Sequence, residues 1–258
     1  MGNTSILVKL GGTAATSYDH LEMLAAELAR RDASVAIVHG GGKEVSELSR
    51  KLGLEPVFHE GIRMTSEGEM DVVEMVLAGL ANKRLVRRLA RHGLRAVGLS
   101  GADAGLVVGT RIAEATGAPS RTARVTAVDV TLIRDLWTLG YVPVLASPAT
   151  DAAGEAVNIN ADDVAFALAG SLRVGSLLFL SDVPGVLIDG EPVVSLTPAM
   201  AAAQIADGSI SGGMIPKVNN AVTALAQGVD QVVIGNYERA GDLERLLDGS
   251  RGTAIVNA

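Results

Sequence analysis

The stretch SVAIVHGGGKEVSELSRKLG, residues 34–53, places an apolar run, three consecutive glycines and an amphipathic segment in direct succession. The apolar run is rich in β-branched residues and predicts a buried strand, and the apolar spacing of the second half predicts a helix. Strand, glycine loop and helix in this order are typical of βαβ units. The loop is not a P-loop, because Lys43 is followed by Glu44 and no glycine stands five residues before Gly42.

The same order recurs along the chain. The run SILVKLGG at residues 5–12 ends in two glycines and is followed by the amphipathic segment HLEMLAAELARR at residues 20–31. The apolar pattern predicts a long helix at residues 72–93. Further strand-like runs occupy residues 95–101, 141–147, 176–187 and 230–236, the third of them ending in a Pro-Gly turn. This alternation predicts an α/β fold with an open, mainly parallel twisted sheet sandwiched by helices, in three αβα layers.

Composition narrows the class of protein. Apolar residues make up 48% of the 258 residues but aromatic residues only 3%, so we expect a core of Ala, Val, Leu and Ile, as in parallel sheets covered by helices. The net charge of -7 argues against a broad nucleic-acid-binding surface, which needs clustered Lys and Arg. The absence of cysteine excludes disulfides and thiolate metal sites, and no histidine pair has the spacing of metal ligands. With no signal-peptide pattern and no apolar run as long as a membrane span, a cytoplasmic protein is expected.

We expect two lobes, residues 1–173 and residues 174–258, although no Pro-rich or Ser-rich linker marks the boundary. The polar stretch at residues 113–129 is expected to form a hairpin or an excursion from the sheet. Residues 189–217 show little regular pattern before a helix that begins at Val218, and the terminal GTAIV at residues 252–256 is compatible with an edge strand.

The glycines after the first two strand-like runs form candidate anion sites. In open α/β sheets, ligands bind beyond the carboxyl ends of the strands, so both glycine loops would face one crevice. Backbone N–H groups in such loops bind anions without help from side chains. Lys9 lies inside an otherwise apolar strand, where a charge is costly unless it is paired or reaches an open site. The structural alternatives are tight turns for the glycines and a snorkelling side chain for Lys9.

Several further polar residues stand where loops meet predicted helices. Lys217 lies in GGMIPKVNNA, where glycines, a proline and a helix start converge, although alone it would be a surface lysine. Asp162 follows Asn158 and Asn160 in VNINADD, near a helix N-terminus, where capping is its structural alternative. Arg63 in GIRMTSEGE is placed to bind a carboxylate with its forked guanidinium, and a solvated loop arginine is the alternative.

Taken in order, these segments resemble the amino acid kinase family over nearly the whole chain. The likeness is carried by LVKLGG, VHGGGK, GIRMTSEGEMDVVEMVLAGLANKRLV, GLSGADAG, GYVPVLAS, VNINADDVAFALA, FLSDVPGVL and SGGMIPKV. It implies transfer of the γ-phosphoryl group of ATP to the side-chain carboxylate of N-acetyl-L-glutamate, the acyl-phosphate step of arginine biosynthesis. A carboxylate is already ionised at neutral pH, so this reaction needs positioning and charge stabilisation rather than a general base.

The likeness also implies roles for individual residues. Lys9 and Lys217 would stabilise the transferring phosphoryl group, and Asp162 would hold both lysines in place. The residues that it assigns to the acyl amino acid are Gly41, Gly42, Arg63 and Asn158, of which the last two would grip the α-carboxylate. The residues that it assigns to ATP and its phosphates are Gly11, Gly12, Ser181, Asp182, Val183, Pro184, Gly185, Val186, Leu187, Ser209, Ile210 and Ser211.

By the same likeness, the N-terminal lobe would bind the acceptor and dimerise, and the C-terminal lobe would bind ATP. Mg²⁺ would be held by the ATP phosphates rather than in a protein cage. The chain departs from the family pattern at Ala102 and Ala104, where relatives commonly have a lysine and a glycine, and in TARVTAVDV, which lacks the usual hairpin glycines. The lid over the substrate is therefore expected to differ. The N-terminal extension associated with hexamers and arginine inhibition is missing from the pattern, so an arginine-insensitive homodimer is expected.

Two other functions remain open on the sequence. A kinase for an aminoadipate derivative in lysine biosynthesis, free or carrier-linked, would use the same chemistry, but GIRMTSEGEMD lacks the basic character that an acidic carrier would require. A catalytically silent amino acid or nucleotide sensor would keep the fold, but Lys9, Asp162 and Lys217 are retained. A dinucleotide dehydrogenase is disfavoured because no G-x-G-x-x-G follows a strand.

Overall fold

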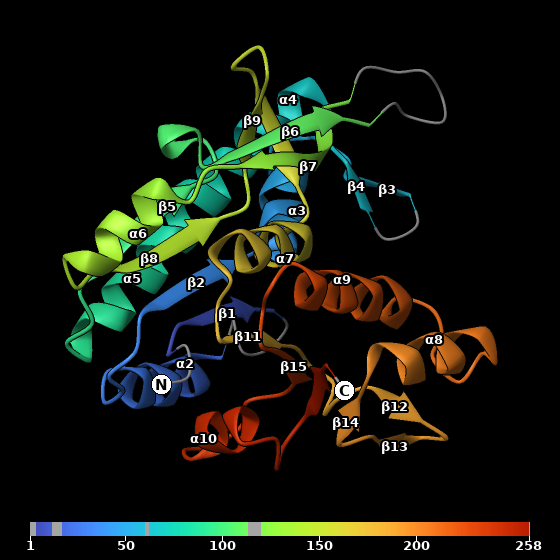
Figure 1. The fold of residues 1–258 in the computed structure, drawn as a ribbon. Coiled ribbons are helices and arrows are strands. Elements are labelled where there is room, and N and C mark those ends of the chain that lie inside the picture. The colour runs from blue at the N-terminus through green and yellow to red at the C-terminus, as the bar shows by residue number, and fades with distance from the viewer. Residues whose placement is uncertain (1–3, 12–16, 60–61, 113–119, 258) are drawn as a thin grey trace.

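The computed structural model describes residues 4–11, 17–59, 62–112 and 120–257. Its centre is an eight-stranded sheet with the order β14-β16-β15-β11-β1-β2-β8-β5 (Figure 1). Neighbouring strands are parallel except β15 and β16, which confirms the predicted mainly parallel sheet. The strands are β1 (Ile6–Leu10), β2 (Val35–His39), β5 (Ala96–Ser100), β8 (Val142–Ala146), β11 (Ser176–Leu180), β14 (Ser195–Leu196), β15 (Gln231–Gly235) and β16 (Thr253–Val256).

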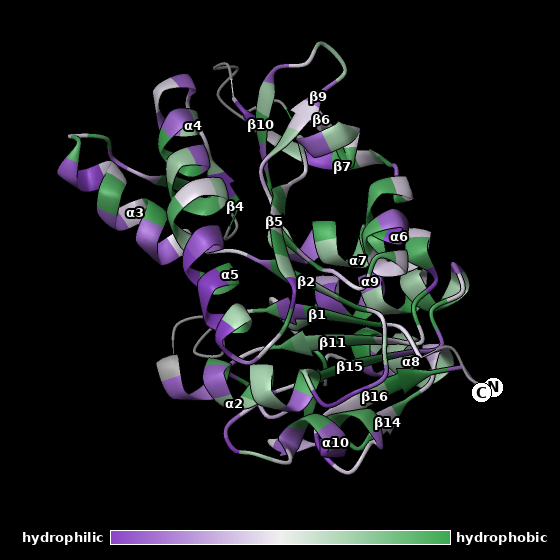
Figure 2. Cartoon of the chain, turned by 90° about the vertical axis from the view of Figure 1, so that its left-hand side faces the viewer, coloured by the Kyte–Doolittle hydropathy of each residue, from purple (hydrophilic) through white to green (hydrophobic). Residues whose placement is uncertain are grey.

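Helices cover both faces of this sheet and give the three predicted layers. One face is covered by α6 (Thr131–Thr138), α7 (Ala161–Leu172), α8 (Pro198–Ala206) and α9 (Met214–Ala226), and the other by α2 (Tyr18–Leu28), α5 (Asn82–Arg91) and α10 (Asp242–Leu247). Because strand residues alternate between faces, Leu7 packs in the first core and Val8 in the second. Figure 2 shows the hydrophobic strands between helices that turn hydrophilic residues outward.

The long helix predicted at residues 72–93 is present and begins earlier, at α4 (Glu67–Glu74). Ser66 caps α4 by accepting a hydrogen bond from the backbone N–H of Glu69. A π-helical segment, Met75–Ala81, joins α4 to α5 without a break. Such segments often occur at functional sites. Here Leu77 of the π segment packs with Val45 of α3 (Gly42–Lys51), directly behind the glycine loop.

Besides the main sheet, the described residues form three smaller β units, of which a barrel and a hairpin precede α7 in the chain. β10 (Ala156–Ile159), β7 (Thr122–Val128), β6 (Val107–Arg111) and β9 (Ala149–Asp151) close into a small barrel, and β3 (Val57–His59) and β4 (Ile62–Met64) form a hairpin. The antiparallel pairing of β6 and β7 confirms the hairpin expected around the polar stretch, of which residues 113–119 lie outside the described residues. Ala104, in the short helix Asp103–Gly105, has a φ of 52°, a conformation that favours glycine.

Two predictions for the C-terminal part are wrong. Residues 189–217 contain α8, β14 and the start of α9, and also β13 (Glu191–Pro192), which pairs with β12 (Leu187–Ile188). The sequence pattern did not predict the Ala-rich α8, because this segment lacks a periodic pattern of apolar and polar residues. Its start is nevertheless marked by Thr197, which caps the helix, and by Pro198 in the first turn. The terminal strand β16 is not at the edge, since β14 pairs outside it. The boundary between the two lobes stays a prediction.

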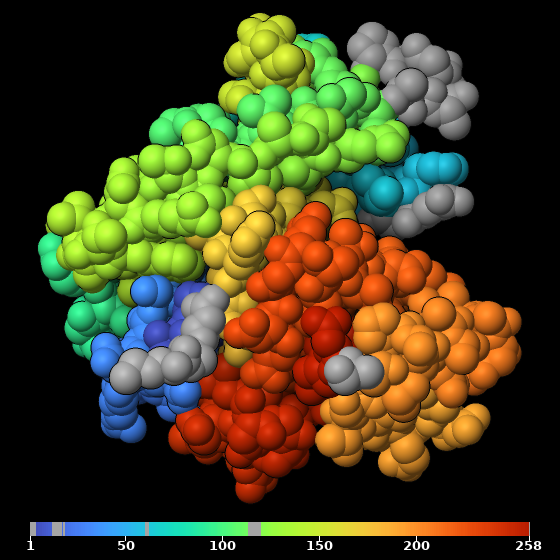
Figure 3. All heavy atoms as spheres, viewed as in Figure 1, coloured from blue at the N-terminus to red at the C-terminus, as the bar shows by residue number. Residues whose placement is uncertain are grey.

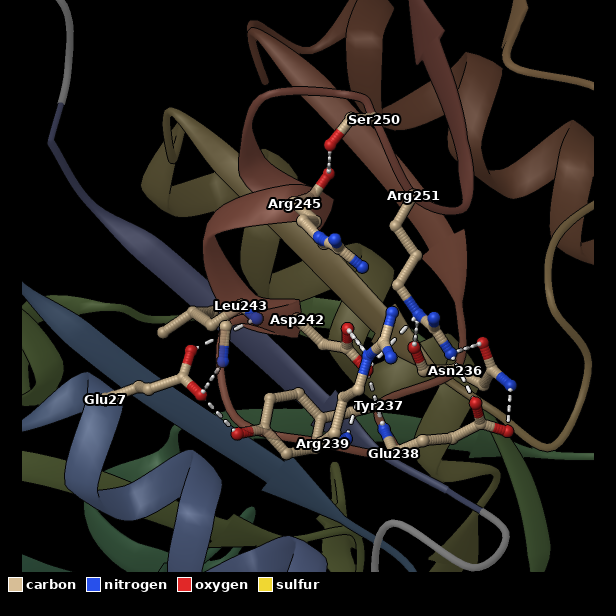
Figure 4. Close-up of polar contacts among 11 residues, drawn as sticks. Glu27, Asn236, Tyr237, Glu238, Arg239, Asp242, Leu243, Arg245, Ser250 and Arg251 are labelled. Atoms are coloured by element: carbon tan, nitrogen blue, oxygen red, sulfur yellow. Dashed lines mark hydrogen bonds and ion pairs between the residues drawn. The ribbon is translucent and has the colours of Figure 1, made fainter.

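The start of α10 is fixed to α2 by one carboxylate (Figure 4). Glu27 accepts hydrogen bonds from the Tyr237 hydroxyl and from the backbone N–H groups of Gly241 and Leu243. Burial and the bond to Glu27 raise the pKa of Tyr237, so this hydroxyl remains a donor. The contact ties α10 to α2, two helices more than 200 residues apart in the sequence. Within the described part of the chain, no helix is long and apolar enough to cross a membrane.

Candidate active site

A cavity of about 570 Å³ opens at the carboxyl ends of β1 and β2. Gly11 and residues 40–42 both border it, as the position of the two glycine loops predicts. Phe58 and Ile62 of the β3–β4 hairpin line its outer part. Figure 3 shows this hairpin, in cyan, on the same side of the molecule as α9, in orange.

Lys9, Asp162 and Lys217 come together beside this cavity. The Nζ atom of Lys9 lies 2.6 Å from Oδ1 of Asp162, and Nζ of Lys217 lies 3.9 Å from Oδ2. Lys9 belongs to β1 and is only 8% exposed, so its ammonium group is paired rather than snorkelling into solvent. Lys217 lies in the first turns of α9. Three residues far apart in the sequence thus form one charged cluster.

Asp162 is not the cap of its helix. Asn160 is the N-cap of α7, and its side chain accepts the backbone N–H of Asp162 at 3.0 Å. The carboxylate of Asp162 is therefore left for the two lysines. The adjacent Asp163 accepts a hydrogen bond from Asn220 of α9, and burial, with a smaller contribution from Asp162, raises the pKa of its carboxyl group. α7 and α9 are thus joined by polar contacts as well as by packing.

The absence of a side chain at Gly11 makes room for Lys9, whereas the backbone N–H of Gly11 is used within the protein. Its backbone N–H donates to the Leu180 carbonyl at 3.0 Å, so it does not point at an anion. A Cβ atom at this position would lie 2.5 Å from Nζ of Lys9 and 3.0 Å from the Leu180 oxygen. Only glycine leaves room for the lysine ammonium here. Gly12, the other glycine of this turn, lies outside the described residues.

The loop at residues 40–42 is held from behind by two buried polar side chains. The Asn82 amide donates to Nε2 of His39 at 3.1 Å, while its own oxygen accepts from Lys83. Nε2 is then an acceptor, and Nδ1–H of His39 donates to the Gly40 carbonyl at 2.9 Å. Because carbonyl and N–H point opposite ways in a trans peptide, this bond turns the N–H of Gly41 away from His39. A Cβ on Gly41 would come within 2.8 Å of Leu77, so close packing requires glycine there.

Acid should destabilise the protein through His39. Burial, with a smaller effect of Lys83, lowers the pKa of His39 below its ordinary value of 6.5, although the Gly40 bond opposes this. Below that value the unfolded chain takes up a proton that the folded chain does not, so stability falls as the pH falls. We expect the free energy of unfolding, from urea titrations, to drop between pH 7.5 and pH 5.5. This pH-dependent loss of stability should be smaller in His39→Leu. It should persist in the control His59→Leu, because the side chain of His59 is exposed. An equal loss in the wild type and both variants would refute the role of His39.

Arg63 lies in β4 as part of a buried polar network rather than in a solvated loop. Its Nη1 atom donates to Glu69 at 2.6 Å, and its Nη2 atom donates to the Gly42 carbonyl and to Ser46. Arg63 is 8% exposed and Glu69 3%. Ser49 donates to the same oxygen of Glu69. Of the five N–H donors of Arg63, three are used by these contacts among the described residues, and the side chain borders the cavity.

Asn158 lies on β10 at the same cavity. Its side-chain amide donates to the Thr65 hydroxyl at 2.8 Å. Thr65 is fully buried, and its backbone N–H donates to the Thr122 hydroxyl, which in turn donates to the Arg63 carbonyl. The two residues expected to grip an α-carboxylate are therefore connected through one network.

The segments expected to bind ATP belong to the C-terminal part of the chain, next to β11 and α9. Residues 181–187 follow β11, and Asp182 borders the cavity. Their backbone is fixed at both ends, by Ser181 N–H to the Gly235 carbonyl and by Val186 N–H to the Thr253 hydroxyl. Residues 209–211 precede α9, the helix that carries Lys217. Val186 and Ile210 are buried, so their side chains support these segments from the core.

Comparison with known proteins identifies the family. The model of the amino acid kinase family matches residues 4–236. The chain belongs to this family. An acetylglutamate kinase of Chloroflexus aurantiacus is 43% identical over 234 residues, 90% of this chain and 92% of that protein. An acetylglutamate kinase of Rubrobacter xylanophilus is 40% identical over 251 residues, 97% of this chain and 96% of that protein. Among solved structures, smu.665 of Streptococcus mutans superposes with a TM-score of 0.80 at 27% identity, covering 99% of both chains.

The structure of this amino acid kinase family member adds several residues to the site that the sequence did not predict. These are Glu69, Ser46 and Ser49 around Arg63, His39 and Asn82 behind the glycine loop, and Phe179 beneath the lysines. Asn82 could have been noticed in the sequence, because it is a polar residue at a helix position where the apolar pattern predicts burial. Within the described ranges, no group of three or more acidic or histidine side chains could hold a metal ion.

Proposed function

We propose that this chain transfers the γ-phosphoryl group of ATP to the side-chain carboxylate of N-acetyl-L-glutamate, giving an acyl phosphate. The observation that carries the proposal is the pairing of Lys9 and Lys217 with one carboxylate beside a cavity that Arg63 borders. Two cations at one place suit a transferring phosphoryl group, whose charge is spread over three oxygens. A third cation beyond them suits a second carboxylate on the acceptor. The acetylglutamate kinases similar to this chain point to the same reaction.

Catalysis in this scheme consists of positioning and charge stabilisation. Lys9 and Lys217 neutralise charge on the phosphoryl group as it passes between the leaving and attacking oxygens. Asp162 holds both ammonium groups, which would otherwise repel each other. The attacking carboxylate carries no proton, so no side chain has to remove one. His39, the histidine nearest to the glycine loop, is buried behind it and is used for support.

The acceptor would occupy the side of the cavity beyond the glycine loop. The N–H donors of Arg63 left over from its internal contacts, together with the amide of Asn158, would bind the α-carboxylate. The amides of Gly41 and Gly42 would contact the acyl amino acid at the start of α3, where no side chain caps the helix.

ATP would lie along residues 181–187 and 209–211, with its γ-phosphate at the lysine cluster. Gly11 serves this site by leaving room for Lys9. Mg²⁺ would be held by the ATP phosphates, where it neutralises charge. The donor set agrees with this, since Asp162 is already engaged by two lysines. A homodimer in the cytoplasm remains the expected state, and the exposed Met75 and Leu80 on the long helix are compatible with a partner.

A hydroxamate assay of acceptors tests this function. Hydroxylamine traps the acyl phosphate formed from ATP with N-acetyl-L-glutamate, N-acetyl-L-aminoadipate or L-glutamate. We expect the first acceptor to have the highest kcat/KM, exceeding the aminoadipate derivative by about tenfold to 200-fold, the usual effect of one methylene group. A preference for the aminoadipate derivative would favour the lysine-pathway alternative. No turnover with any acceptor would overturn the kinase function and favour a silent sensor.

A further inference from the structure

The ammonium groups of Lys9 and Lys217 both lie over the ring of Phe179, in a sheet that otherwise has few large aromatic side chains. The ring of Phe179, on β11, has its centre 4.6 Å from Nζ of Lys9 and 5.1 Å from Nζ of Lys217. Among β1, β2, β8, β11 and β15, the strands around this point, Phe179 is the one residue that is Phe, Tyr or Trp. The chain has three phenylalanines in all, so a ring at this place is unusual for its composition.

The strand register explains why the ring and Lys9 meet. Phe179 is the direct neighbour of Lys9 across the parallel pair β1–β11. Neighbouring residues of paired strands project from the same face of a sheet, so the lysine side chain lies along the ring. That face is covered by α7 and α9, which bring Asp162 and Lys217 to the same place.

The ring is itself held in place. Phe166 of α7 stacks on it with the ring centres 5.3 Å apart and an angle of 14° between the planes. Phe166 lies one helical turn after Asp162, so one face of α7 supplies both the carboxylate between the lysines and the support under the ring. Phe179 is fully buried and Phe166 almost so. Phe166 therefore supports the ring of Phe179 from the helix side.

An aromatic ring does something here that a leucine of similar volume cannot do. Among the described residues, Asp162 is the one carboxylate in an ion pair with either ammonium group, so it supplies one negative charge for two positive ones. The face of an aromatic ring is negative, and it attracts ammonium groups most strongly where water is excluded. A ring face also attracts without forming fixed hydrogen bonds, so it leaves the lysine N–H donors available to phosphate oxygens.

We propose that Phe179 is a positioning residue whose ring face holds the ammonium groups of Lys9 and Lys217 together beneath the transferring phosphoryl group. The proposal rests on the roles proposed above for these lysines and adds the third component of their environment, after Asp162. It predicts that the electron density of the ring, and not only its volume, sets the rate of phosphoryl transfer.

Stepwise fluorination of the ring separates these two contributions. Phenylalanine at position 179 is replaced by its mono-, di- and trifluoro analogues through nonsense suppression in the full chain, with Phe179→Leu as a further variant. Fluorine changes ring size little but withdraws electrons from the ring face. We expect log kcat to fall with each fluorine, by about tenfold in total, with the KM for N-acetyl-L-glutamate unchanged. Thermal unfolding of each variant shows whether the fold is retained.

The same analogues at Phe166 are the matched control, because that ring shares the packing but is not within contact of either ammonium group among the described residues. We expect no trend of kcat with fluorine number at this position. A flat series at Phe179, or equal slopes at both positions, would overturn the inference. If Lys9→Ala and Lys217→Ala are inactive while the series is flat, the inference alone fails. If those lysine variants keep wild-type kcat, the proposed function of the lysines fails together with it.

Discussion

Replacing Lys9 by methionine should lower kcat by about 10³-fold or more while the protein stays folded. In the proposed mechanism, Lys9 is one of two cations that take up charge on the transferring phosphoryl group, and such groups are the main catalytic device when no proton has to move. Methionine keeps the length and the apolar stem of the side chain, so packing beside Phe179 is retained. The measurement is steady-state ADP release with saturating N-acetyl-L-glutamate, accompanied by thermal unfolding.

Lys43 offers a matched control for this substitution. It borders the same cavity, follows the same glycine loop and is exposed, but the proposed mechanism gives it no role. Lys43→Met should therefore stay close to wild-type kcat. Gly11→Ala provides an independent perturbation, because its Cβ would lie 2.5 Å from Nζ of Lys9 and must displace it. The mechanism would be untenable if Lys9→Met lost no more activity than Lys43→Met.

The position of this lysine could be predicted from the sequence because a buried charge in an apolar strand is a strong signal. The run LVKLGG placed Lys9 two residues before a glycine turn, and parallel strands bring such turns to one edge of the sheet. The pairing of Lys217 with Asp162 had no such signal, since the two residues belong to different helices. It was implied by the family likeness, and the structure brings their side chains within 3.9 Å.

Other parts of the site could not be read from local patterns because they depend on tertiary contacts. Glu69 stands in the first turn of a helix, where an acidic residue is ordinary, and nothing local marks it as a buried partner of Arg63. The contact of Phe179 with the lysines requires the register of β1 and β11. The inner position of β16 likewise depends on β14, a strand of only two residues, which is too short to recognise by alternation.

The largest effect on stability is expected from the buried pair of Arg63 and Glu69. Arg63→Met should lower the free energy of unfolding by about 3–5 kcal/mol, because it leaves the Glu69 carboxylate buried without its cation. The double substitution Arg63→Met with Glu69→Met should recover most of this loss, since apolar side chains of similar volume can replace a buried ion pair. Urea unfolding of the wild type, both single variants and the double variant measures the coupling between the two positions.

The double variant also separates stability from acceptor binding. If Arg63 binds the α-carboxylate, removing it should raise the KM for N-acetyl-L-glutamate by at least about tenfold in the single and the double variant alike, because a hydrogen-bonded charge pair is lost in both. The KM for ATP should change little, since the proposed function assigns Arg63, which borders the cavity, to the acceptor and not to ATP. A double variant that regained both stability and acceptor affinity would show that Arg63 serves only the fold. One that remained as unstable as Arg63→Met would show that the unpaired Glu69 carboxylate is not the cause of the instability.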